Sequence, residues 1–302
     1  ACLAVVFSHL AMSFFPFLHH FDPNEKTDLA WVYAIHHLPF GFLYSGDAAV
    51  FVFFVLSGFV LSYAILKSPQ QFHAKINNMM IKRYPRLMIP ALTSCVIIWL
   101  VLKVIHIDSS HVGAWLHAFA IQDFSFKHAV YEGTIGAFLF SESDINWVLW
   151  TMTIELMGSF ALFFLLYLYH YKHIAFLLGS LLIPCLAFLW RGQGFSFGIS
   201  SFIIGIYIYL YAKPLSNLVA IPMLLIGLYL AGAHNTSAAY SWVHHILGEN
   251  TYDYSNFIAG ILIVYSVLMS PLLSKGLDHP ILVWLGKIVG ELVCSFGSKK
   301  TL

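Results

Sequence analysis

The stretch GDAAVFVFFVLSGFVLSYAILKSPQQFHAKINNMMIKRYPRLMIP, residues 46–90, decides the fold class of this chain. After Gly46 and Asp47, residues 48–66 contain no charged side chain. A helix rises about 1.5 Å per residue, so this run is long enough to cross a hydrocarbon core of about 30 Å. Residues 67–86 then carry three lysines and two arginines but no Asp or Glu. The change predicts a membrane span followed by a basic cytoplasmic loop.

The composition of the whole chain is also that of a membrane protein. Of its 302 residues, 60% are hydrophobic and 10% are charged, with a mean hydropathy of +0.80. Soluble domains carry roughly 25% charged residues. The net charge of +1 indicates no particular partner, and we expect no nucleic-acid partner. We therefore predict an integral, multi-pass protein of the lipid bilayer.

Further apolar runs divide the chain into successive segments. They fall at about 1–18, 48–66, 87–105, 147–169, 174–190, 195–212, 218–233 and 257–273, with a shorter one at 281–294. These runs show no internal repeat. We predict an all-α bundle of about eight or nine transmembrane helices that forms one domain over residues 1–302. Because the first run starts at residue 1, we expect the chain to begin inside its first span.

The basic residues also predict the orientation of the helices. If residues 67–86 are cytoplasmic, alternation of the spans places three later lysines on the same side: Lys172, Lys213 and Lys275. Two long outer segments result, 107–146 and 234–256, which are rich in Trp, Tyr, His and acids. They either line a substrate site or belong to the aromatic belt at the membrane surface. Residues 133–140 are too short to span, and we expect a re-entrant or interfacial piece there.

Two ionisable side chains lie inside the apolar runs. His9 is about ten residues from the end of its run, or about 15 Å below the outer surface. Glu155 lies eight residues after Trp147, or about 12 Å deep. Thr151 and Ser159 share its helix face at a spacing of four residues. Intramembrane ionisable groups are costly and mark functional sites by default, and a carboxylate at the depth of His9 can fix the tautomer of its imidazole.

Each of these residues also has a structural interpretation. His9 would then be a neutral imidazole bonded to a neighbouring helix, and Glu155 a protonated acid bonded to a backbone carbonyl.

Asp47 starts a helix, where exposed amides favour a carboxylate, so we expect a capping role. Gly58 and its neighbouring serines allow two helices to approach closely, so we expect packing rather than nucleophilic chemistry.

The remaining polar residues indicate no further chemistry. Arg191 ends an apolar run and is either an interfacial anchor or a contact for an acceptor. Three His pairs lie in predicted outer loops without the spacing of a zinc site: 19/20, 36/37 and 244/245. The four cysteines show no metal or disulfide spacing either, and we expect them to be packing residues. We therefore expect no metal.

Four motifs give the chain a resemblance to a known family. FFVLSGFVLS, residues 53–62, is followed after a basic segment by RYPRLMIP, residues 83–90. WTMTIE, residues 150–155, and HPILVWLGKI, residues 279–288, follow in the same order. Together they resemble the acyltransferase 3 family of polytopic membrane O-acyltransferases in its fungal form. Compared with that family, an Arg eleven positions before His9 and the last helix are missing, so we expect truncation at both ends.

The resemblance implies an enzyme that moves an acyl group from cytoplasmic acyl-CoA to a hydroxyl of a carbohydrate, lipid or small-molecule acceptor. It implies a catalytic role for His9, with Glu155 as the carboxylate that orients it. The phosphates of acyl-CoA would bind to a basic set, because guanidinium forks match phosphate geometry: Lys82, Arg83 and Arg86.

A proton-coupled transporter is the alternative. His9 and Glu155 would then form a proton relay near the membrane midplane. The number of helices suits both functions. A transporter would give the basic segment at residues 67–86 no role, and the chain shows no internal repeat.

Overall fold

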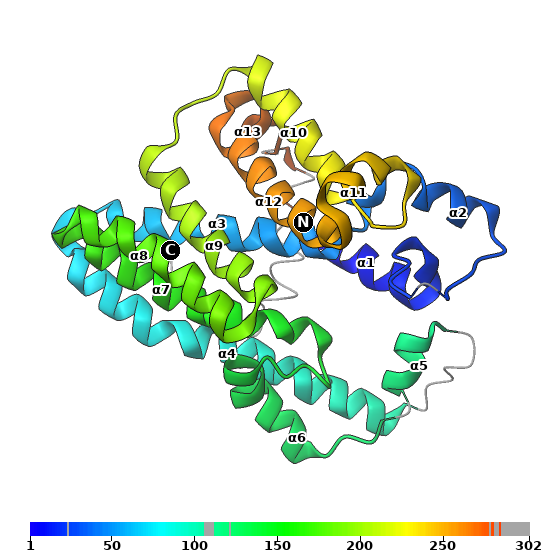
Figure 1. Cartoon of the computed structure of the whole chain (residues 1–302). Coiled ribbons are helices and arrows are strands. Elements are labelled where there is room, and N and C mark those ends of the chain that lie inside the picture. The colour runs from blue at the N-terminus through cyan, green and yellow to red at the C-terminus, as the bar shows by residue number, and fades with distance from the viewer. Residues whose placement is uncertain (23, 106–111, 121, 278, 281–283, 285–302) are drawn as a thin grey trace. The chain divides into compact units, whose positions relative to one another are not determined.

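The computed structural model describes residues 1–22, 24–105, 112–120, 122–277, 279–280 and 284 (Figure 1). The model is 82% helical, and no strand occurs in the part of the chain that it describes. The predicted all-α class is confirmed. The predicted run at 281–294 and most of the motif at 279–288 lie outside the described residues.

Six of the described helices are long and apolar enough to cross a membrane. They are Gly46–Leu66, Pro69–Val104, Trp147–Tyr171, His173–Arg191, Gln193–Tyr211 and Ala238–Met269. Two shorter apolar helices, Cys2–Phe14 and Asn217–Ala231, coincide with further predicted runs. The chain is thus a multi-pass membrane protein, whereas the count of eight or nine spans stays a prediction.

The chain divides into two compact units. The first holds the described residues within Ala1–Ser57, Ser109–Ala118 and Leu210–Gly276, and the second those within Gly58–Asp108, Phe119–Tyr209 and Leu277–Leu302. Helix α3, Gly46–Leu66, passes from one unit to the other after Ser57. The structure defines each unit by itself, and the single domain over 1–302 stays a prediction.

The first unit is built from apolar helices and the short turns between them. Its elements besides the start of α3 are α1 (Cys2–Phe14), η1 (Pro16–Leu18), α2 (Ala30–His36), η2 (Gly41–Leu43), α10 (Asn217–Ala231), η6 (Ala238–Tyr240), α11 (Ser241–Leu247), η7 (Gly248–Asn250), α12 (Thr251–Met269) and α13 (Pro271–Leu277), with α5 (Ala114–Ala120) at its edge. Helices α10 and α12 pack along each other. Gly41 and Gly232 touch through their backbones, since a Cβ on Gly41 would lie 2.6 Å from the carbonyl oxygen of Gly232.

The second unit is organised along one long helix, α4 (Phe72–Val104), which follows the short η3 (Pro69–Gln71). Its other elements are α6 (Phe126–Tyr131), the π-helix η4 (Glu132–Phe140), η5 (Trp147–Thr151), α7 (Met152–Tyr171), α8 (His173–Arg191) and α9 (Gln193–Tyr211). Helix α7 lies between α4 and α8 and contacts both (Figure 1). The predicted re-entrant piece at 133–140 is this π-helix, and its place in a membrane stays a prediction.

The basic segment is helical, which corrects the predicted loop at residues 67–86. Helix α4 starts at Phe72 and continues without a break through Pro85 and Pro90. Ala, Lys, Met and Arg, which favour helices, are frequent between Phe72 and Arg86. The prediction took the start of the apolar run at residue 87 as the start of the helix, whereas α4 begins fifteen residues earlier, at Phe72.

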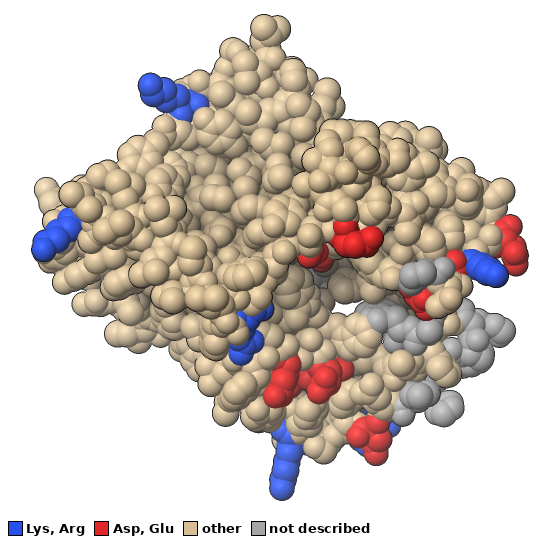
Figure 2. Space-filling model, in the orientation of Figure 1, with Lys and Arg blue, Asp and Glu red and all other residues tan. Residues whose placement is uncertain are grey.

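The exposed surface agrees with a lipid environment. On α8, Leu181 is 71% exposed and Leu189 is 79% exposed, although both are large apolar residues. Charged side chains are sparse on the face that Figure 2 shows, where apolar and uncharged residues fill wide areas. Surfaces of this kind are unfavourable in water and favourable against lipid tails.

Gly58 provides a test of the predicted helix packing. A Cβ at this position would lie 2.9 Å from the backbone carbonyl carbon of Phe202 in α9, so α3 and α9 touch there through their backbones. The predicted packing role of Gly58 is confirmed. We expect Gly58→Ala to lower stability by about 1–3 kcal/mol, because the backbone of Phe202 must move. The measurement is the thermal midpoint of the protein purified in detergent.

Gly276→Ala is the matched control, because a Cβ at Gly276 would meet nothing within 4 Å. We expect it to leave the midpoint unchanged. Equal midpoints for Gly58→Ala and the wild type would contradict the close packing of α3 against α9.

Candidate active site

Arg83 and Glu155 form an ion pair in the second unit. Nη2 of Arg83, on α4, donates to Oε2 of Glu155, in the first turn of α7, over 2.5 Å. Their side chains are only 18% and 14% exposed. Nε of Arg83 is buried and has no hydrogen-bond partner among the residues that the structure describes. The guanidinium is therefore held on one side only.

Ring contacts at the other end of the two helices show that α4 and α7 run in opposite directions. Phe72 stacks on His170 with ring centroids 4.3 Å apart, so the start of α4 meets the end of α7. The helix between Glu155 and His170 rises about 22 Å. Arg83 and Glu155 thus meet between two helices that each contain a candidate membrane span. The predicted place of Arg83 at the cytoplasmic surface stays a prediction.

The other members of the basic set differ from Arg83. Lys82 and Arg86 are exposed, whereas Arg83 is partly buried. The set therefore separates into one arginine that is bonded to Glu155 and two cations that are open to a ligand. Whether they bind the phosphates of acyl-CoA stays a prediction.

The start of α7 is held in place by a buried carboxylate. Glu132 is fully buried, and its two oxygens accept hydrogen bonds from the backbone N–H groups of residues 144, 145 and 146, each 2.9 Å long. Asn146 then caps the next turn, because its Oδ1 accepts from the N–H of Val148. Glu132 thereby fixes the turn that leads into α7 and positions Glu155.

Thr151 and Ser159 share the helix face of Glu155 but not its environment. The hydroxyl of Thr151 donates to the carbonyl oxygen of Val148, and that of Ser159 donates to the carbonyl oxygen of Glu155. Both hydroxyls bond the backbone of their own helix. Of the three residues that share this helix face, Thr151, Glu155 and Ser159, it is Glu155 that makes a charged contact.

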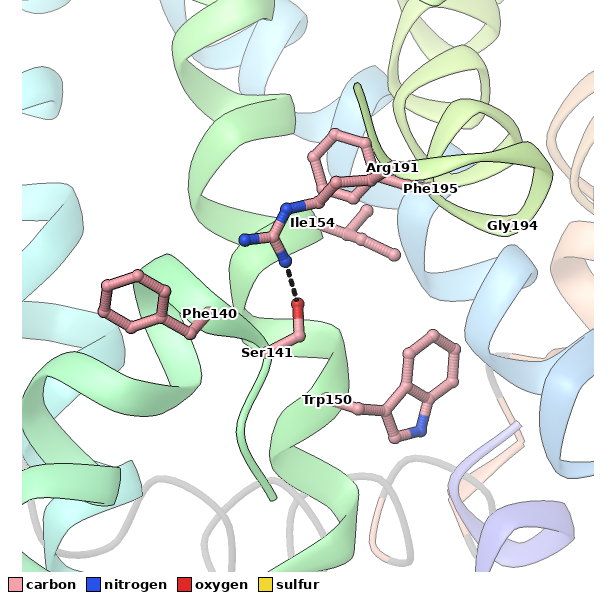
Figure 3. A pocket seen from close by; sticks show the side chains of 7 residues that line it. All are labelled: Phe140, Ser141, Trp150, Ile154, Arg191, Gly194 and Phe195. Carbon is pink, nitrogen blue, oxygen red and sulfur yellow. Dashed lines mark hydrogen bonds between the residues drawn. The ribbon is translucent and has the colours of Figure 1, made fainter. Parts of the chain in front are cut away.

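A cavity of about 410 Å³ opens beside the same helix (Figure 3). Arg191 points into it and donates to Oγ of Ser141 over 2.8 Å and to the carbonyl oxygen of Leu139 over 2.5 Å. The guanidinium also lies 4.7 Å from the ring centre of Trp190. The guanidinium of Arg191 therefore has hydrogen-bond acceptors and an aromatic ring as partners within its own unit. This supports an anchoring role.

His9 belongs to the first unit and lies halfway along α1. Its side chain is partly buried, and its carbonyl oxygen accepts from Oγ of Ser13 over 2.8 Å. Glu155 belongs to the second unit. The predicted pairing of these two side chains, and the catalytic role of His9, therefore stay predictions.

In the first unit, histidines that lie far apart in the sequence are in contact with one another. His19, His20, His36 and His234 contact one another through their rings, with centroids 5.5 to 5.9 Å apart. A cavity of about 220 Å³ lies against three of them, with Phe21, Glu249 and Tyr252 also in its wall. The hydroxyl of Tyr252 bonds the side chain of Asp47, in the first turn of α3. Sequence reasoning missed this cavity because its residues come from loops more than 200 positions apart.

One group of side chains has the composition of a metal site. A ring nitrogen of His128 and carboxylate oxygens of Glu132 and Asp144 all lie within 4.8 Å of one another. However, Glu132 already accepts three backbone hydrogen bonds. This leaves few lone pairs for a cation. We propose no metal there, and our expectation of no metal remains untested.

Comparison with known proteins assigns the chain to a family. The model of the acyltransferase 3 family, an acyltransferase domain, matches residues 1–289. The chain belongs to this family, as the four motifs predicted, and it is a membrane acyltransferase. No curated protein and no solved structure matches it.

The Arg83–Glu155 pair yields a prediction about stability. Glu155→Leu leaves a buried guanidinium, which cannot lose its proton, so we expect a loss of about 3–5 kcal/mol. Arg83→Met should cost less, because the Glu155 carboxyl can take up a proton. The double variant Arg83→Met/Glu155→Leu should be more stable than Glu155→Leu alone, because it leaves no unpaired charge. The measurement is the thermal midpoint in detergent.

Lys103→Met is the control for this series. It breaks the ion pair of Lys103 with Asp123, whose side chains are 45% and 84% exposed. Exposed pairs contribute about 0–1 kcal/mol, so the midpoint should hardly change. Equal, small losses for Lys103→Met and Glu155→Leu would show that the Arg83–Glu155 pair is not buried.

Proposed function

We propose that the protein transfers an acyl group from acyl-CoA to a hydroxyl of a carbohydrate, lipid or small-molecule acceptor. Acyl transfer follows from the family. The nature of the donor is supported by the basic face of α4, where Lys82 and Arg86 are exposed without an acid between them. Phosphate groups of CoA carry the charge that such a face attracts.

In this proposal His9 is the general base. It removes the proton of the acceptor hydroxyl as the oxygen attacks the thioester carbonyl. The resulting tetrahedral oxyanion collapses, the carbon–sulfur bond breaks, and the ester forms. The proton on His9 then passes to the CoA thiolate, so that the imidazole returns to its neutral form.

The observation that carries the proposal is the buried ion pair of Arg83 and Glu155. Charges inside a membrane are expensive and are rarely found without a function. Arg83 also keeps a buried Nε that no described residue bonds. A guanidinium that is fixed by Glu155 can stabilise negative charge that develops in acyl transfer.

A transporter remains the alternative to be tested, although no observation favours it. The family is one of acyltransferases. A proton relay would use the same ionisable groups but would give the exposed Lys82 and Arg86 no substrate to bind.

Acyl-CoA binding is the test of this function. We expect acetyl-CoA to raise the thermal midpoint of the purified protein, since a ligand at 100 times its Kd stabilises the folded state by about 2.7 kcal/mol. Arg86→Lys keeps the charge but loses the bidentate fork, so it should weaken binding roughly ten- to a hundredfold. The concentration of acetyl-CoA that gives half the maximal shift measures this change.

Lys103→Met serves as the control for a lost exposed cation on the same helix. It should bind acetyl-CoA as the wild type does. Unchanged affinity in Arg86→Lys would remove the basic face of α4 from the donor site. No shift with acetyl-CoA, together with substrate-dependent proton flux in liposomes, would instead indicate the transporter.

A further inference from the structure

The cavity beside α2 and α12 in the first unit has a buried polar atom with no partner. His19 is 2% exposed and lines this cavity of about 220 Å³. Its Nδ1 is buried without a hydrogen-bond partner in the described part of the chain. An unpaired buried nitrogen is unfavourable, so such an atom calls for a ligand or an ordered water.

The other nitrogen of His19 determines what Nδ1 can do. Nε2 lies 3.3 Å from the carbonyl oxygen of Ser8 and 3.3 Å from its hydroxyl. A carbonyl oxygen only accepts hydrogen bonds, so Nε2 carries the proton. In the neutral ring Nδ1 is then a lone pair, which can accept a hydrogen bond from a ligand.

The wall of the cavity favours a ligand without negative charge. Burial lowers the pKa of His19 to about 4 and that of His234 well below its usual value, so both rings are neutral at pH 7. Glu249 contributes a carboxylate to the same wall. An anion would meet the like charge of Glu249, whereas hydroxyl groups would find donors and acceptors.

Local geometry supports a binding role. His20, which also lines the cavity, has a positive φ of 45°, a conformation that is unfavourable for a residue with a side chain. Phe21 and Tyr252 meet edge to face, with ring centroids 5.3 Å apart. They give the wall aromatic surface beside its polar groups. Strain of this kind in a cavity wall agrees with a site held for a ligand.

The cavity also lies close to the proposed base. Ser8, which holds His19, directly precedes His9 in α1. By contrast, the cavity of the second unit is lined by Arg191, whose guanidinium already bonds Ser141 and Leu139.

We propose that the cavity of the first unit binds the acceptor, and that Nδ1 of His19 accepts a hydrogen bond from an uncharged hydroxyl group of it. The proposal rests on the function proposed above, since it assigns the hydroxyl substrate to a place in the structure. The volume suits one small ring or a short polyol, because drug-sized ligands occupy about 300–1,000 Å³.

Two substitutions of His19 separate its two nitrogens. His19→Asn puts an amide near the position of Nδ1 and keeps an acceptor there. His19→Gln reaches the position of Nε2, so it keeps a group at Ser8 but loses the acceptor in the cavity. His245→Phe is the control, because His245 is exposed and does not line the cavity.

The experiment measures binding to the purified full chain in detergent without acyl-CoA. The probes are methyl glucoside and glycerol as uncharged hydroxyl compounds and glucuronate as the anionic match. We expect an uncharged probe to raise the thermal midpoint of the wild type, His19→Asn and His245→Phe. The half-saturating concentration should rise about tenfold in His19→Gln, and glucuronate should bind more weakly than methyl glucoside.

The proposal is wrong if neither uncharged probe shifts the wild type, or if His19→Gln binds as the wild type does. Stabilisation by acetyl-CoA is measured on the same samples. An acetyl-CoA shift without any probe shift would overturn the acceptor site but leave the donor site intact. A probe shift without an acetyl-CoA shift would overturn the proposed enzyme while keeping a hydroxyl-binding cavity.

Discussion

The ion pair of Arg83 and Glu155 is the constraint on which the second unit depends. It joins α4 to α7 through two charged side chains that are only 18% and 14% exposed. Breaking a pair of this kind is costly, whereas apolar side chains in its place would hold the helices as well. Stability alone therefore does not explain the pair, and we attribute it to the chemistry of acyl transfer.

The surrounding structure serves to aim these charges. Glu132 holds the turn before α7 through three backbone hydrogen bonds, and Gly58 lets α3 approach α9 through backbone contact. The first unit provides the other half of the proposed chemistry, with His9 on α1 and a histidine-lined cavity next to it.

The sequence predicted the helices better than it predicted the surroundings of the site residues. Apolar runs such as 48–66 mark spans because the requirement for an uncharged helix is local. The start of α4 was missed because Lys and Arg favour a helix as much as they signal a loop, so charge alone could not place it at Phe72. Arg83 was taken as a surface cation, since only the opposite helix shows that Glu155 is its partner. The cavity at His19 and His234 depends on contacts across more than 200 residues, which no local pattern reveals.

The most direct test is the activity of the double variant Arg83→Met/Glu155→Leu, reconstituted in liposomes with labelled acetyl-CoA and an uncharged hydroxyl acceptor. Transfer of the label to the acceptor is measured beside the wild type and His9→Ala, after equal amounts of folded protein are confirmed. If the buried charges serve acyl transfer, the double variant is folded but inactive, as is His9→Ala. A folded double variant that transfers acetyl at the wild-type rate would contradict this account, because the pair would then serve only to hold α4 and α7 together.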